Sequence, residues 1–284
     1  MSRVLCFVLA LLLCGCSSLP DAAEQAAPAA LAFNEPAPTS SLVPASARGS
    51  EGRQVSYRRE STPDAQLAVP SLPVPSLPVS SPIVETEIAV MPETLSSIDV
   101  FDAASEFSEI KITLQRFDEF NEPRVFRIVG ESGDWFRVQV PMRPNESTGF
   151  IRKSDVEVTS TDQRILIDLS ERSVVVWNGD EVVLDTTGTI GKPSTPTPTG
   201  SFYVRNVFEW YTDSIYGPYV IPLSAYSESI DQINGGDAVV AIHGTQRPDL
   251  VGAAASLGCI RLDNDTLREL AAIVEPGAPV EVVE

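Results

Sequence analysis

The sequence predicts a mainly β protein, in which a small β-barrel-like module precedes a β-rich domain with a C-terminal helix. Three observations support this fold class. Short β-branched and aromatic runs, divided by turn residues, recur from residue 96 onward. Asn178-Gly179, within this series, is a strong hairpin signal. The one convincing helical periodicity begins near Asn264.

The first 16 residues indicate an export signal. Arg3 supplies a positive charge, and the apolar run at 4–14 is too short to span a hydrocarbon core of ~30 Å. The run ends at Gly15-Cys16, which resembles the lipidation signal of bacterial lipoproteins. We therefore expect a signal peptide at 1–16, a lipid on Cys16, and an exported protein that is anchored to a membrane of the cell envelope.

Residues 17–95 differ in composition from the rest of the chain. Of the 23 prolines, 12 lie between residues 17 and 92, and a near-repeat occupies 69–73 and 74–78. Proline at this density interrupts both helical and strand patterns, so the sequence predicts a disordered, polyproline-rich tether. The alternative is a passive spacer whose length matters little.

The β module is expected at residues 96–158. Its predicted strands are 110–114, 124–129, 135–140 and 149–156. The segments 131–138 and 149–151 resemble bacterial Src-homology-3-like modules, which often accompany cell-wall enzymes. Trp135 could contact the wall, but core packing is the favoured role for an aromatic residue in so small a domain.

The second domain is expected at residues 162–284. Its predicted strands are 164–169, 173–177, 181–187, 201–208 and 238–242. Asn264 is the expected cap of the helix, in which Leu267, Leu270, Ala271 and Val274 then share one face.

Composition argues against several functions. The chain has 20 basic and 39 acidic residues, a net charge of −19, whereas nucleic-acid binding requires clustered Lys and Arg. Polybasic recruitment to anionic lipid is disfavoured for the same reason. A single histidine excludes a multi-His metal centre, and three of the four cysteines lie within the first 16 residues. We therefore expect no metal and no partnership with nucleic acid.

His243 and Cys259 are the candidate reactive pair. His243 ends an apolar run, and Cys259 follows sixteen residues later. An adjacent imidazole lowers the pKa of a thiol from about 8.5, and the thiolate can attack an acyl carbon and hold it as a thioester. Gly258 lacks a Cβ, so the N–H groups of Gly258 and Cys259 could approach an oxyanion. Spacing alone leaves open a small buried cysteine beside 253–255 and a purely structural histidine.

Five motifs resemble those of the L,D-transpeptidases, the penicillin-insensitive enzymes that cross-link peptidoglycan. In chain order they are 192–202, 216–219, 223–226, 243–244 and 256–261. The resemblance covers residues 163–284 and implies the β-rich L,D-transpeptidase catalytic fold. It implies that Cys259 is the nucleophile, that His243 is the base, and that the Gly244 carbonyl orients the imidazole.

The resemblance also implies a set of oxyanion- or substrate-binding residues, namely Ser256, Leu257, Gly258, Arg261 and Tyr226. Arg261 is the candidate for pairing with a stem carboxylate, because a guanidinium can bind one bidentately. The alternative for Arg261 is a surface ion pair with Asp263 or Asp265.

Leu257 departs from the family pattern, which usually has histidine directly before the glycine. The family base is the upstream histidine, which corresponds to His243. We therefore expect the departure to affect rate or specificity more than the basic mechanism, while a degenerate, non-catalytic domain stays open as an alternative.

The resemblance implies particular partners. They are the donor tetrapeptide and the acceptor amine of peptidoglycan stem peptides, with the membrane reached through the lipid on Cys16. No organic cofactor is required by this chemistry. Two other functions stay open: an L,D-carboxypeptidase or cysteine peptidase that hydrolyses wall peptides, and a non-catalytic wall-binding lipoprotein.

Overall fold

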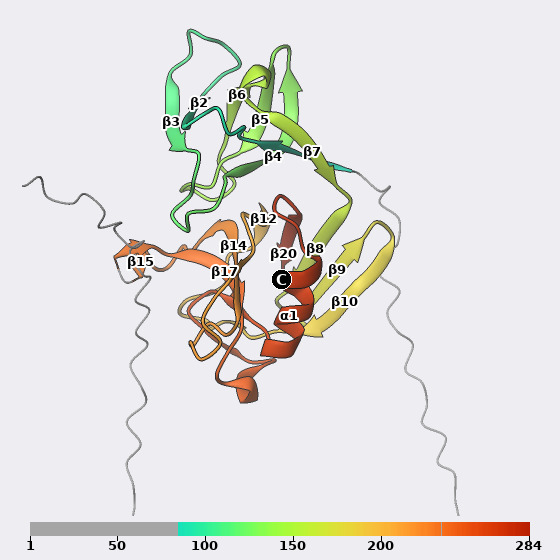
Figure 1. Cartoon of the computed structure of the whole chain (residues 1–284). Helices are drawn as coiled ribbons and strands as arrows, with labels where there is room; N and C mark the ends of the chain where they lie inside the picture. Colours follow the sequence, from blue (N-terminus) through green and yellow to red (C-terminus); the bar gives the residue numbers. More distant parts are fainter. Residues whose placement is uncertain (1–84, 234) are drawn as a thin grey trace, which may run out of the picture.

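The computed structural model describes residues 85–233 and 235–284. Figure 1 shows two β-rich parts, one above the other, which we call the β module (86–161) and the C-terminal domain (163–284). The predicted signal peptide, its Cys16 and nearly all of the predicted tether lie outside the described residues. Strands predominate and the described residues contain one α-helix, so the predicted mainly β class is confirmed.

The β module is a seven-stranded sheet with the order β3-β2-β6-β5-β4-β1-β7. Its strands are β1 (Thr86–Val90), β2 (Ser97–Phe101), β3 (Ile110–Gln115), β4 (Val125–Ser132), β5 (Trp135–Gln139), β6 (Thr148–Arg152) and β7 (Glu157–Thr161). A 3-10 turn at Lys153–Asp155 links the last two. Strand β1 lies between β4 and β7. The predicted boundary at residues 95 and 96 is therefore wrong, because the module begins at Thr86 and the tether ends before it.

Trp135 packs inside the module, as the core-packing interpretation predicted. Its exposure is 8%, and its ring meets Phe101 edge to face with the centroids 5.1 Å apart. Met91, Phe126 and Ile151 occupy the module core nearby in full burial. A wall-contacting role for this tryptophan is thus not favoured.

The C-terminal domain is built from two sheets that enclose one apolar core. The first sheet, in spatial order, contains β10 (Glu181–Thr187), β9 (Ser173–Asn178), β8 (Gln163–Asp168), β20 (Pro279–Val283) and β12 (Gly200–Tyr203). The second contains β13 (Phe208–Glu209), β14 (Tyr219–Tyr226), β17 (Val239–His243) and β19 (Ile260–Arg261). Two short pairs complete it: β11 (Ile190–Gly191) with β18 (Ala254–Ser256), and β15 (Gln232–Ile233) with β16 (Gly236–Asp237).

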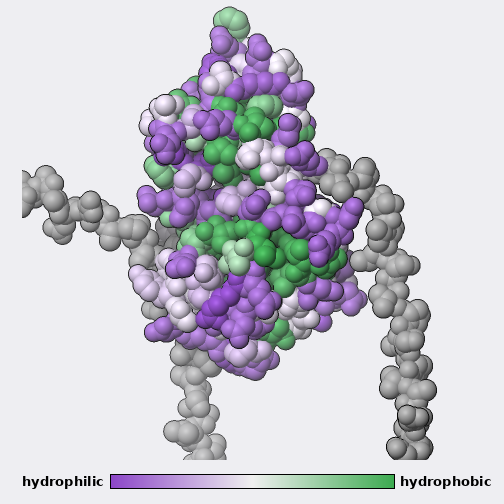
Figure 2. Space-filling model, turned by 45° about the vertical axis from the view of Figure 1, so that its right-hand side comes forward, coloured by the Kyte–Doolittle hydropathy of each residue, from purple (hydrophilic) through white to green (hydrophobic). Residues whose placement is uncertain are grey.

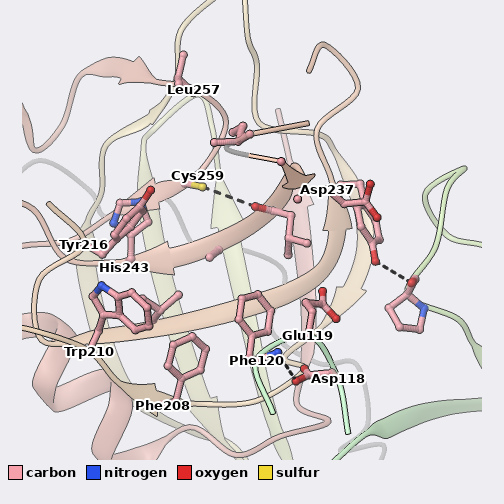
Figure 3. Close-up of a pocket in the computed structure, with 18 of the residues that line it drawn as sticks. Asp118, Glu119, Phe120, Phe208, Trp210, Tyr216, Asp237, His243, Leu257 and Cys259 are labelled. Carbon is pink, nitrogen blue, oxygen red and sulfur yellow. Dashed lines mark hydrogen bonds between the residues drawn. The ribbon is translucent and has the colours of Figure 1, made fainter. Parts of the chain in front are cut away.

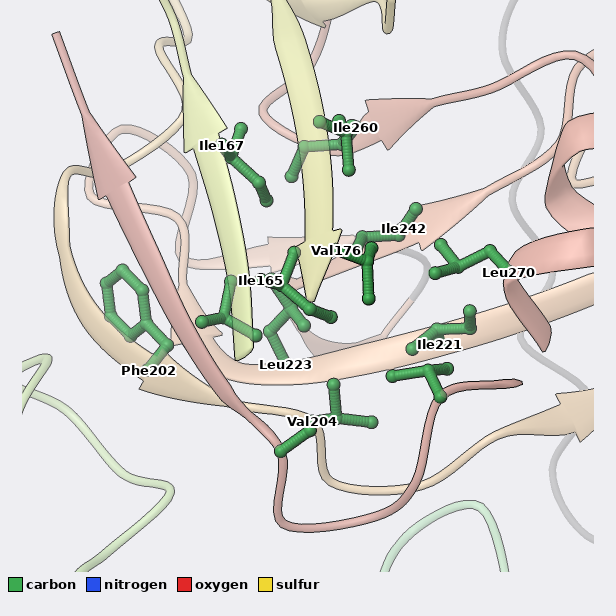
Figure 4. Packing of buried hydrophobic residues seen from close by; sticks show 14 of the residues in the cluster. Ile165, Ile167, Val176, Phe202, Val204, Ile221, Leu223, Ile242, Ile260 and Leu270 are labelled. Carbon is green, nitrogen blue, oxygen red and sulfur yellow. The ribbon is translucent and has the colours of Figure 1, made fainter. Parts of the chain in front are cut away.

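Figure 4 shows the core between these sheets. Ile165 and Val176 of the first sheet face Ile221 and Ile242 of the second, and each is at most 2% exposed. Removing such side chains from water contributes about 1.5–3 kcal/mol each. Helix α1 (Asn264–Ile273) covers one side of the core through Leu270. The core thereby fixes β17 and β19 as a rigid base for the loops that follow them.

Two predicted boundaries in the C-terminal domain are wrong. The expected strand at 201–208 is interrupted, because β12 ends at Tyr203 and β13 begins only at Phe208. The helix cap is Asp263 rather than Asn264, since the Asp263 side chain accepts hydrogen bonds from the backbone N–H groups of residues 265 and 266. A 3-10 turn at Pro248–Leu250 was not expected from the sequence.

The two parts meet directly after a one-residue junction at Asp162. Tyr203 of the C-terminal domain is fully buried against Ile88 and Val125 of the module, and its hydroxyl donates to the Val125 carbonyl at 3.1 Å. Figure 2 shows a band of apolar surface across the middle of the molecule, near this contact. None of the helices in the described residues is long and apolar enough to cross a membrane.

Candidate active site

A cavity of about 980 Å³ lies between the β module and the C-terminal domain. Both parts contribute to its walls. Cys259, His243 and Leu257 belong to the C-terminal wall, and Asp118 and Phe120 belong to the module wall. Figure 3 shows these side chains around one shared space.

Strand pairing brings the two predicted reactive residues into this cavity. Strands β17 and β19 run parallel, with Ile242 opposite Ile260, so Cys259 emerges just before β19 beside the strand that His243 ends. The Cys259 side chain is partly exposed, and its Sγ lies 4.0 Å from the Val239 carbonyl oxygen. Of the four cysteines, this is the one within the described residues, and it is a free thiol.

The imidazole of His243 is held neutral and oriented. Its Nδ1 lies 2.7 Å from the Gly244 carbonyl oxygen. A carbonyl oxygen can only accept, so Nδ1 carries the hydrogen and Nε2 keeps its lone pair. The residue is 3% exposed, and burial, aided by the charge of Arg261, lowers the pKa of His243 to about 3. The ring of Tyr216 meets the imidazole edge to face at 4.9 Å.

The residue after His243 must be glycine, because no side chain fits at position 244. A Cβ there would lie 2.2 Å from Asn264 Oδ1 and 3.0 Å from the Gly217 Cα. The Gly244 N–H donates to the Tyr216 carbonyl at 2.7 Å, and Asn264 Oδ1 accepts from the Thr245 N–H. The backbone after His243 is therefore fixed from both sides.

Ser256 organises the loop that carries the thiol. It is fully buried, its hydroxyl donates to the Cys259 carbonyl at 2.6 Å, and it accepts from the Gly258 N–H at 3.0 Å. Gly258 has a φ of +124°, which favours glycine. The predicted oxyanion role of the Gly258 N–H is therefore not met in this geometry, because that donor is already used within the loop.

Leu257, Arg261 and Tyr226 all line the cavity, and their predicted role in substrate binding stays a prediction. Tyr226 is also a structural contact, since its hydroxyl donates to the Pro141 carbonyl of the module at 2.8 Å. Of the two acids proposed as alternative partners of Arg261, Asp263 caps helix α1, and Asp265 pairs with Arg268 at 2.7 Å.

The module wall was not predicted from the sequence. Arg205 of the C-terminal domain bonds Glu119 through two nitrogens at 2.6 and 2.7 Å and reaches Asp118 at 3.2 Å. The side chains of Arg205 and Asp118 are each 3% exposed. Burial alone would lower the pKa of Arg205, but Glu119 raises it, and Arg205 in turn lowers the pKa of Glu119 against the effect of burial. Arg205 and Glu119 therefore form a charged pair.

An aromatic row continues from the module into the C-terminal domain. Phe120 stacks on Phe208 with centroids 5.2 Å apart, and Phe208 meets Trp210 at 5.9 Å. Figure 3 shows this row on the side of the cavity that also carries Tyr216 and His243. Neither Phe120 nor Trp210 was expected to belong to the site, because no local motif marks them.

The site has the features of cysteine-based acyl transfer: a partly exposed thiol, a neutral imidazole with a fixed tautomer, and a large cavity. In the described residues, no group of three or more His, Cys, Asp or Glu is placed to hold a metal ion.

Comparison with known proteins agrees with this class. Residues 162–282 match the model of the YkuD family, the L,D-transpeptidase catalytic domain. The family resemblance predicted from the sequence is therefore confirmed for this segment. The predicted Src-homology-3-like character of the β module stays a prediction.

Two relatives of this chain are Bacillus proteins described as candidate L,D-transpeptidases of the YkuD type. The Bacillus licheniformis relative is 34% identical over 119 residues, or 42% of this chain and 64% of the relative. The Bacillus subtilis relative is 39% identical over 93 residues, or 33% of this chain and 49% of the relative. This chain thus spans 64% and 49% of the length of these two relatives. The catalytic domain of an Enterococcus faecium L,D-transpeptidase, solved by NMR, is 30% identical, with a TM-score of 0.32 and coverage of 43% of this chain and 97% of that one.

Proposed function

We propose that this protein is an L,D-transpeptidase of the cell envelope that cross-links peptidoglycan stem peptides through a thioester on Cys259. The observation that carries the proposal is that Cys259 and His243 line one cavity from two adjacent parallel strands, with His243 Nδ1 committed to the Gly244 carbonyl. The family assignment of residues 162–282 supports it. The exported, lipid-anchored location through Cys16 is part of the same proposal.

The first half of the reaction forms the thioester. The Cys259 sulfur attacks the carbonyl carbon of the third residue in a donor tetrapeptide, and Nε2 of His243 takes the thiol proton. The tetrahedral intermediate collapses, the C–N bond to the terminal D-alanine breaks, and His243 returns the proton to the leaving amine. Because Nδ1 carries the hydrogen, Nε2 of the neutral imidazole has a lone pair with which to accept the thiol proton.

The second half transfers the acyl group. The side-chain amine of a neighbouring stem attacks the thioester carbon, His243 removes a proton from that amine, and the restored thiol leaves as a new amide forms. Attack by water would instead give the hydrolysed tripeptide. The cavity between the two domains has room for a peptide chain next to the thiol.

Mass spectrometry of reactions with a synthetic tetrapeptide stem tests the proposal. We expect cross-linked dimers and free D-alanine from the wild type, a covalent adduct on the intact protein with a carbapenem, and neither with Cys259→Ala. Tripeptide without dimer would favour the carboxypeptidase function. Absence of turnover together with absence of an adduct on correctly folded wild type would favour the non-catalytic wall-binding function.

A further inference from the structure

The β module contributes charge as well as shape to the cavity. Arg124 and Arg143 of the module both line it, together with Cys259. The chain as a whole has a net charge of −19, so two arginines on one wall of this cavity are a local exception. The role of each guanidinium depends on the groups that neutralise it.

Arg124 is held in place at one nitrogen only. Its Nε donates to the Gln115 carbonyl at 3.0 Å, which fixes the plane of the guanidinium. Among the described residues, no acceptor bonds its two terminal nitrogens, and no carboxylate lies within ion-pair distance of it. The two terminal nitrogens present the parallel N–H groups that bind a carboxylate bidentately.

The nearest acids do not supply the missing acceptor. Both oxygens of Glu119 bond Arg205. One oxygen of Asp118 accepts from Arg205 and Asn206, and the other accepts from two backbone N–H groups of its own loop. These acids act on Arg124 only through space, while Arg205 repels it. The carboxylate oxygens of Asp118 and Glu119 are thus already used. The two terminal nitrogens of Arg124 are left for a group that enters the cavity.

Arg143 adds a positive charge to the module wall, and its hydrogen-bond partners do not neutralise that charge. Its guanidinium donates to the carbonyls of Ser227, Ile230 and Asp231 and lies over the ring of Tyr226 at 5.1 Å. Backbone carbonyls satisfy its hydrogen bonds but carry no net charge. The module wall therefore favours an anion beside Arg124.

We propose that Arg124 is a substrate-binding residue, which pairs with a carboxylate of the stem peptide and makes the β module an integral part of the active site. This inference rests on the proposed function, because that function supplies a ligand rich in carboxylates. The module would then recognise a carboxylate of the stem peptide, rather than attach the protein to the wall.

Isothermal titration calorimetry on Cys259→Ala protein, which binds without turning over, tests the proposal. The ligands are a tetrapeptide stem and a series in which each of its carboxylates is amidated in turn. In the Cys259→Ala parent, which keeps Arg124, we expect amidation of one particular carboxylate to weaken binding about 10- to 100-fold, as for a hydrogen-bonded charge pair. In Cys259→Ala/Arg124→Gln, the same amidation should have no further effect, and Arg124→Lys should recover part of the loss.

Arg137→Gln is the matched control, because Arg137 lies in the same module, is exposed, and bonds only the Thr148 hydroxyl with its guanidinium. It should bind every peptide as the parent does. If Arg124→Gln binds the acid and amidated peptides with the same ratio as the parent, the Arg124 assignment is wrong while the proposed function stands. If folded Cys259→Ala protein binds no stem peptide in any form, both the assignment and the proposed function are wrong.

Discussion

The two walls of the cavity differ in the charge state of their buried ionisable groups. On the C-terminal wall, burial lowers the pKa of His243, so the imidazole is neutral. On the module wall, Arg205 pairs with Glu119 and Asp118, and this pairing lowers the pKa of Glu119 against the effect of burial. One wall thus holds a buried neutral group, and the other holds a buried cluster of ion pairs that joins the module to the domain. Changes on the first wall should affect rates, and changes on the second should affect stability.

The largest effect is expected for His243→Ala. General base catalysis typically contributes 10²–10⁴ in rate, so transfer at pH 7 should fall by about that factor. A free thiol ionises near pH 8.5, so the variant should recover as pH rises toward that value. Wild-type kcat/KM should show no loss attributable to His243 until well below pH 6.5. Rates measured from pH 5 to 9 test this, and a variant with no recovery would contradict the base role.

Breaking the charge pairing on the module wall should destabilise the protein. Arg205→Met leaves Asp118 buried without its partner, and such single removals cost about 3–5 kcal/mol. Urea unfolding should show a correspondingly lower free energy. Arg247→Met is the control, because Arg247 pairs with Asp249 on the exposed surface, where an ion pair contributes little to stability. Equal losses in the two variants would mean that burial of the Arg205 pair has no special effect.

As pH falls, the protein should lose the stability that depends on neutral His243 before it loses the stability that depends on ionised Glu119. The pKa of His243 is about 3 when folded and 6.5 when unfolded, so the unfolded chain binds more protons between these values. Stability due to neutral His243 is therefore full above pH 6.5 and falls as pH decreases. Between pH 6.5 and 4.5, the loss should be about 2–3 kcal/mol. The lowered pKa of Glu119 adds its own loss only at still lower pH.

Unfolding by urea at pH 6.5 and 4.5 measures this difference. In His243→Gln the loss over that interval should be smaller than in the wild type by the amount given. An identical acid dependence in both proteins would show that the imidazole is not held neutral by the fold.

The smallest effect is expected for the aromatic row. Phe120→Ala removes the stacking on Phe208, which contributes about 0.5–1.5 kcal/mol beyond area burial. Thermal unfolding should detect a small loss, and KM for a stem peptide should rise more than kcat falls. Phe107→Ala is the matched control, since Phe107 is fully exposed in the same module and should change neither. An unchanged KM in Phe120→Ala would confine the row to a structural role.

The reactive pair was predictable because its signal is local. His243 ends an apolar strand, and Cys259 lies within a six-residue motif, so both could be selected without knowing the fold. The module wall had no such signal. Arg205 and Glu119 lie 86 residues apart, and only the packing of two domains brings them together. Arg124 and Phe120 are ordinary residues of a loop until that packing is known.

Strand positions were predictable where apolar alternation was clear, and less so elsewhere. Strand β20 (Pro279–Val283) begins at a proline and lies after the helix, yet it pairs in parallel with β8 at the centre of the first sheet. Strand β1 was assigned to the tether because prolines surround it in sequence. Its place was decided by hydrogen bonds to β4 and β7, which are more than 30 residues away. Long-range pairing of this kind leaves little trace in a short segment.

The position of β1 has a mechanical consequence. Thr86 at the start of β1 pairs with Thr161 at the end of β7, one residue before the C-terminal domain begins at Gln163. The start of β1 therefore lies next to the junction between the β module and the C-terminal domain, midway along the molecule (Figure 1). A pull exerted through the N-terminal side reaches that junction directly, with little leverage on the far ends of either domain.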